Sequence, residues 1–148
     1  MDERVMKLKT PEECEVFARN VAERGRSDLA QQAVKRAVEL RAASYGAKTI
    51  AEQECLRAIY AYEELLTKKN GRRTKASRTW QMIHRHGILP AAERAVNREA
   101  PTQGYKALIE MGLQEYAFEA VILRYPKLFS PEAVRRSTER MKEWGGTK

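Results

Sequence analysis

Apolar residues recur every three or four positions along most of this chain, which is the spacing of amphipathic helices. The first such stretch follows a Thr-Pro-Glu-Glu motif at residues 10–13, which has the form of a capping box with proline at the first helical position. A second stretch, residues 27–45, follows after only a short link. We therefore expect these two helices to fold back on each other as an antiparallel hairpin.

A longer helix is expected from a second capping box at residues 49–52 to about Lys69, just before an Asn-Gly pair. Its roughly 20 residues would span about 30 Å, so that the basic segment after it would begin at the far end of this helix. Ser77 is the expected N-cap of the next helix, residues 77–86. Gly87 then breaks the pattern before a helix at 90–98.

A polar link at residues 99–104 separates these elements from the C-terminal part of the chain. We expect helices there at 105–111 and 113–125, and a last one that opens at Ser130 and turns Trp144 inward. The pattern predicts no β-strand, because β-branched residues never alternate over a useful length. The expected fold is an all-α bundle of about seven or eight helices, with residues 1–69 as a scaffold and residues 70–148 packed against it.

Length and composition narrow the class of protein. The chain has 148 residues, enough for one domain with a real core, and no apolar run near the roughly 18–20 residues that cross a bilayer. Its first residues lack the apolar middle of a signal peptide, so we expect a cytoplasmic protein without a membrane partner. Cys14 and Cys55 fall on apolar helix faces and are expected to be small buried hydrophobes, with a structural disulfide as the alternative.

The positive charge of the chain is concentrated in one segment. Residues 1–66 carry 11 Lys/Arg against 12 Asp/Glu, residues 67–98 carry 9 against 1, and residues 99–148 carry 8 against 7. The central segment therefore has the same net charge, +8, as the whole chain. Cations at a helix C-terminus also suit the helix dipole, which accounts for Lys68 and Lys69 but not for the cations beyond the helix.

A concentrated basic segment beside a helix start is typical of a site for a polyanion. Lysine and arginine would neutralise phosphates, while hydroxyls and the N–H groups at the helix start would bind phosphate oxygens. The arginines have a second possible role, in reading guanine edges. A solvated loop and an acidic protein partner are the alternatives. The candidate nucleic-acid-binding residues are Lys68, Lys69, Arg72, Arg73, Lys75, Ser77, Arg78, Thr79 and Arg85.

Helices 77–86 and 90–98 have about the lengths of a helix-turn-helix, with a glycine in the turn. However, Ile83 stands where a small residue usually packs, and Glu93 stands where an apolar residue is expected. An ordinary helical corner is therefore the preferred interpretation. Trp80 is expected to anchor the core rather than stack on a base, because Met82 and Ile83 are its neighbours.

Catalytic and metal-binding patterns are weak. His84 and His86 are two residues apart, on different sides of a helix, with no nearby cysteine or aspartate to complete a zinc site. Glu110, Glu115 and Glu119 have the charge of a nuclease cluster, and Glu115 and Glu119 are expected on one helix face. No aspartate or histidine lies in that region to hold a metal or activate water. Ion pairing within the bundle is therefore the preferred role of these glutamates. We expect no enzyme activity, metal or cofactor.

The sequence thus favours a DNA-binding helical protein, with duplex DNA preferred over single strands and over RNA, that acts as a regulator or targeting module. The alternative is a protein-protein adaptor that uses its helical hairpins and binds no nucleic acid. The sequence leaves open whether the nucleic acid is DNA or RNA, which site is recognised, the oligomeric state and the pathway.

Overall fold

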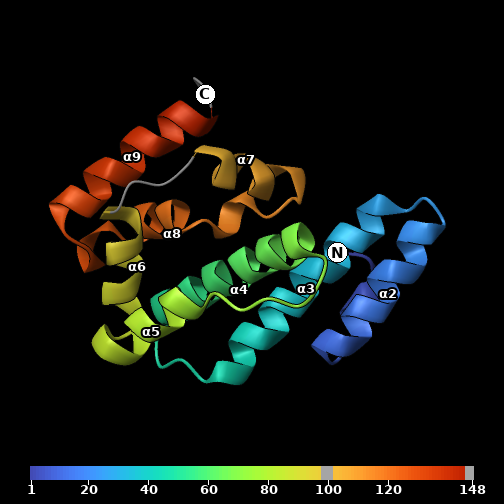
Figure 1. Cartoon of the computed structure of the whole chain (residues 1–148). Coiled ribbons are helices and arrows are strands. Elements are labelled where there is room, and N and C mark those ends of the chain that lie inside the picture. Colours follow the sequence, from blue (N-terminus) through green and yellow to red (C-terminus); the bar gives the residue numbers. More distant parts are fainter. Residues whose placement is uncertain (98–101, 146–148) are drawn as a thin grey trace. The chain divides into compact units, whose positions relative to one another are not determined.

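Helices account for nearly all of the secondary structure in the computed structural model (Figure 1). The structure describes residues 1–97 and 102–145, with the side chains of 102–105 and 144–145 excepted. The described residues contain no strand, which confirms the expected all-α fold. The elements are α1 (Glu3–Met6), α2 (Pro11–Glu23), α3 (Ser27–Tyr45), α4 (Ile50–Asn70), α5 (Ser77–His86), α6 (Ile88–Asn97), α7 (Thr102–Glu110), η1 (Gln114–Tyr116), α8 (Phe118–Arg124), η2 (Pro126–Leu128) and α9 (Pro131–Gly145).

The chain separates into two compact units, Met1–Ala47 and Lys48–Lys148. The long helix α4, expected as part of the scaffold of residues 1–69, thus belongs to the second unit. In the first unit α2 and α3 pack along each other as the expected hairpin. Thr10 caps α2, because its Oγ1 accepts from the N–H of Glu13 at 3.1 Å.

Helix α4 is the longest element and the one against which α6, α7, α8 and η1 of the second unit pack. Thr49 caps it as expected, and it ends where Gly71 takes a left-handed conformation. One apolar core joins α4 to the helices that follow it. Its buried members are Cys55, Ala58, Ala92, Val96, Val121, Ile122, Phe129 and Ala133.

The single helix expected over residues 113–125 is wrong. Its first turn is the 3₁₀ helix η1, and α8 begins only after Ala117, whose φ of −58° and ψ of 145° interrupt the helix. In one straight helix Leu113 and Ile122 would lie about 180° apart, on opposite sides. The break at Ala117 turns α8, so that both side chains are completely buried.

Two further expectations concern the ends of the C-terminal elements. Helix α7 begins at Thr102, inside the expected link at 99–104. Residues 98–101 lie outside the described residues. The side chain of Trp144, which was expected to point inward, also lies outside them. The last helix opens as expected, with Ser130 Oγ accepting from the N–H of Ala133 at 3.1 Å. Within residues 1–97 and 102–145, no helix combines the length and apolar character needed to cross a membrane.

Candidate nucleic-acid interface

Six cations of the basic segment stand exposed on consecutive elements of the second unit. Two occupy the last turn of α4, two the loop at residues 71–76, and two α5. The charged group of each has no ion-pair or hydrogen-bond partner among the residues that the structure describes. We call this set the cationic surface: Lys68, Lys69, Arg72, Lys75, Arg78 and Arg85.

The loop at residues 71–76 is held against α4 by short-range hydrogen bonds. The N–H of Thr74 donates to Oγ1 of Thr67 at 3.0 Å, and Nδ2 of Asn70 donates to Oγ1 of Thr74 at 3.1 Å. The Thr74 hydroxyl in turn donates to the carbonyl oxygen of Arg72 at 2.9 Å. With Gly71 turning the chain at a φ of 72°, the loop doubles back along the last turns of α4.

Glu63 fixes the far end of this loop and the start of α5. It lies on α4 and is only 4% exposed, and its Oε2 accepts both from the N–H of Ala76 at 2.9 Å and from Nε1 of Trp80 at 2.6 Å. Ala76 is the N-cap of α5, without a side-chain cap. The expected cap at Ser77 is therefore wrong, because a carboxylate from α4 holds the residue that precedes the helix.

Arg73 is the one cation of the loop that is neutralised. Both terminal nitrogens of its guanidinium lie 2.8 Å from Oε2 of Glu64, whose side chain is 11% exposed. Arg72 and Arg73 are thus adjacent in sequence but differ in role, since only Arg72 presents an uncompensated charge to solvent. Of the two candidate hydroxyls, Ser77 is exposed, whereas Thr79 is buried against the fold.

Trp80 packs inward, as expected for a core anchor. Its ring lies 5.3 Å from that of Tyr60 on α4 at an interplanar angle of 56°, and its Nε1 is bound to Glu63. This geometry is a tilted aromatic contact of the kind that stabilises cores. The indole thus ties α5 to α4 and does not offer a stacking platform for a base.

The junction of α5 and α6 has the geometry of a helical corner. Gly87 alone separates the two helices, with φ 94° and ψ 171°, whereas a helix-turn-helix uses a turn of three or four residues. Ile83 is buried at the corner. Glu93 is half-buried, and its Oε1 accepts from the N–H of Ser130 at 2.7 Å. Both residues that fitted the motif poorly therefore have structural roles.

Glu110, Glu115 and Glu119 lie on three different elements. Glu115 belongs to η1 and Glu119 to α8, so the expectation that they share one helix face is wrong. Glu119 is 7% exposed and pairs with Arg140 at 3.1 Å. His84 and His86 are exposed at the end of α5. In the described part of the chain, no three acidic, histidine or cysteine side chains cluster closely enough to hold a metal ion.

The acidic residues Glu63 and Glu64 anchor the basic segment to α4. Both are buried and point into the loop's inner side, where they bind Arg73, Ala76 and Trp80. Sequence reasoning missed their role as loop anchors, although two adjacent glutamates among the mostly apolar residues of this part of the helix were a usable signal. Comparisons with protein-family models, with curated proteins and with solved structures find no match.

Proposed function

We propose that this protein binds nucleic acid through the cationic surface, with duplex DNA as the main form, and acts as a regulator or targeting module. One observation supports this most strongly: six exposed cations on consecutive elements lack any carboxylate partner in the described residues, while Glu63 and Glu64 of the same region are buried. Uncompensated lysine and arginine release counterions when they meet phosphates, which is the main source of sequence-independent affinity.

The fixed loop supports the same proposal. Hydrogen bonds from Thr74 and Ala76 hold the loop before any ligand arrives, so that its cations need little further ordering to meet a phosphate backbone. A cytoplasmic location belongs to this proposal, and the two free cysteines, Cys14 and Cys55, suit a reducing compartment.

The test is a fluorescence anisotropy titration of the whole chain with a labelled 20-base-pair duplex, the matching single strand and an RNA duplex. Six phosphate contacts predict a slope of about −5 in log K against log salt, or a loss of about 1,000-fold between 50 and 200 mM salt. Absence of binding to any of the three at 50 mM salt would overturn the proposal.

A matched pair of variants separates a specific surface from general charge. Lys68→Gln/Arg72→Gln/Lys75→Gln removes three cations of the surface, and Arg19→Gln/Lys127→Gln/Lys142→Gln removes three exposed cations elsewhere. Both lower the net charge from +8 to +5. The first should flatten the salt slope by about 3 and the second should leave it near the parent value. Equal losses in both would contradict a localised interface.

The alternative, an adaptor that binds another protein through its helical hairpin, predicts a different result. A partner held by apolar and hydrogen-bonded contacts should stay bound at high salt and after nuclease treatment. Nucleic acid held by the cationic surface should be released by salt.

A further inference from the structure

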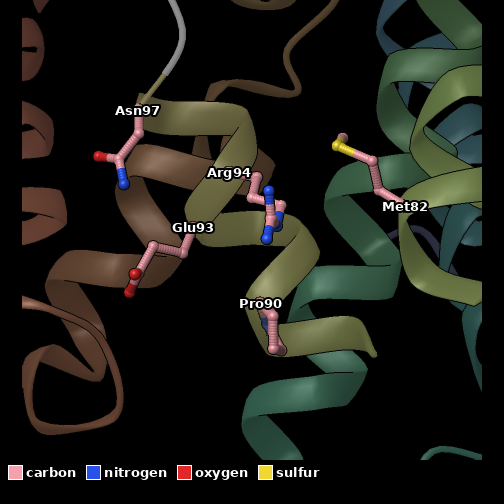
Figure 2. A pocket seen from close by; sticks show the side chains of 5 residues that line it. All are labelled: Met82, Pro90, Glu93, Arg94 and Asn97. Atoms are coloured by element: carbon pink, nitrogen blue, oxygen red, sulfur yellow. The ribbon is translucent and has the colours of Figure 1, made fainter. Parts of the chain in front are cut away.

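A hollow of about 530 Å³ lies where α5 meets α6, next to the cationic surface. Its lining consists of Met82 from α5 and Pro90, Glu93, Arg94 and Asn97 from α6. In Figure 2 the thioether end of Met82 points from α5 toward α6. The volume falls within the range of about 300–1,000 Å³ that is usual for small-ligand pockets.

Two cations of the cationic surface lie on the side of α5 that borders this hollow. Arg78, Met82 and Arg85 are spaced by four and three residues, which places them along one face of the helix. Across the hollow, Arg94 is exposed on α6 and has no ion pair within the described residues. A phosphate backbone that follows α5 therefore meets a further cation on α6, which the sequence analysis did not select.

The hollow is lined by apolar groups as well as by a cation. The thioether of Met82, the ring of Pro90 and the guanidinium plane of Arg94 are surfaces on which a planar base packs. Glu93 is occupied by the N–H of Ser130. The Oδ1 of Asn97 is buried and not accessible from the hollow, so the hollow offers apolar contact from Met82 and Pro90 and a cation from Arg94.

We infer that this hollow receives one unpaired base of the bound nucleic acid, with Arg94 contacting the adjoining phosphate. The preferred substrate is then a duplex that carries an unpaired or extruded nucleotide beside the segment held by the cationic surface. This inference rests on the proposed function and adds its substrate class. A base outside the stack costs least to place when it is already unpaired, so such DNA should bind more tightly than a fully paired duplex.

The test compares three labelled 20-base-pair DNA duplexes: one fully paired, one with a single extra nucleotide in the middle, and one with an abasic residue at that position. The bulged duplex should bind about 5-fold more tightly than the paired one, the lower end of the range for stacking one base on an aromatic ring, because none of the lining residues is aromatic. The abasic duplex should lose most of this gain, because it keeps the bend and the phosphate but lacks the base.

Variants attribute the preference to the hollow. Met82→Ala and Arg94→Gln should each reduce the ratio of bulged to paired affinity, whereas Met111→Ala and Arg19→Gln should keep it. The ratio is measured within each variant, so a general loss of folding cancels. Equal binding of the three duplexes, or a ratio unchanged in Met82→Ala, would overturn the inference and leave the proposed function standing. Failure of all three duplexes to bind at 50 mM salt would overturn both.

Discussion

The indole Nε1 of Trp80 lies 2.6 Å from Oε2 of Glu63, and the same oxygen accepts the N–H of Ala76 at 2.9 Å. One buried carboxylate thereby joins the loop, the start of α5 and the middle of α4. Hydrogen bonds to an ionised acceptor are stronger than those between neutral groups. Glu63 is therefore expected to determine where the cationic surface lies.

Replacing Glu63 by alanine should lower the free energy of unfolding by about 2–5 kcal/mol, because two buried donors lose their acceptor. Glu63→Gln keeps one carbonyl acceptor and should lose less. Urea unfolding followed by Trp80 fluorescence in a Trp144→Phe background measures both, with the exposed Glu139→Ala as control. A loss no larger than that of the control would contradict this role.

Arg72 and Arg73 form a natural comparison, since they are neighbours with the same charge and only Arg73 is paired with Glu64. Under the proposed function, Arg72→Gln should flatten the salt slope of nucleic-acid binding by about 0.9 and Arg73→Gln should change it little. Conversely, Glu64→Gln should release the Arg73 charge and raise affinity by about 3- to 10-fold at low salt. Equal effects of the two arginine variants would argue against the distinction.

Gly87 should tolerate alanine less well than Gly71, another glycine of the second unit with positive φ. Gly71 has φ 72° and ψ 11°, a left-handed conformation that other residues reach at moderate cost, whereas Gly87 at φ 94° and ψ 171° is in a region used almost only by glycine. Neither position is crowded, since a Cβ at Gly87 would meet only Pro90 Cδ at 3.7 Å. We expect a loss of about 1–3 kcal/mol for Gly87→Ala and a smaller one for Gly71→Ala, by urea unfolding; equal losses would contradict the difference.

Burial raises the pKa of Cys55 to about 12 from the ordinary value of 9.0. Because the folded-state pKa is the higher one, its contribution to stability is complete below about pH 9 and is lost as pH rises toward 12. Between these pH values the free energy of unfolding should fall more steeply in the parent than in Cys55→Ala. The difference in slope should be up to about 1.4 kcal/mol per pH unit. Urea unfolding at pH 8.5 and 10.5 measures the difference, and parallel pH profiles would contradict it.

Arg140 and Glu119 form a buried ion pair, with side chains 13% and 9% exposed. Arg140→Met should destabilise the protein by about 3–5 kcal/mol, because it leaves a buried carboxylate without its cation, and Arg140→Met/Glu119→Met should recover much of this loss. Arg135 pairs with Glu139 on the same helix, but both side chains are at least 60% exposed, so Arg135→Met should cost less than about 1 kcal/mol. Equal losses for the two arginines, measured by thermal or urea unfolding, would refute the role of burial.

Local signals predicted three of the helix starts. Thr10, Thr49 and Ser130 cap their helices as expected, because a cap depends on residues within one turn. The break at Ala117 carries no glycine or proline and arises from packing on both sides of it, so local sequence does not reveal it. Likewise, nothing local distinguishes Arg72 from Arg73, since their difference depends on Glu64, nine residues before Arg73 on another element.

In the candidate site, too, local sequence predicted some features and tertiary packing determined the others. The charge pattern identified the exposed cations, but the burial of Thr79 and the inward position of Trp80 depend on how α5 packs on the rest of the unit. Arg94 was not among the candidate residues, because it lies beyond Gly87 in the sequence. Only the packing of α5 against α6 brings it to the same hollow as Met82.

The hydrogen bonds that hold the loop of residues 71–76 also bear on kinetics. Under the proposed function, a loop that is already ordered needs no conformational change before binding, and its positive charge steers a polyanion toward it, so association should be fast. Contact with a polyanion should then be made quickly, broken quickly, and repeated at neighbouring phosphates. Such exchange would let the molecule scan a long polymer before it stops at one position.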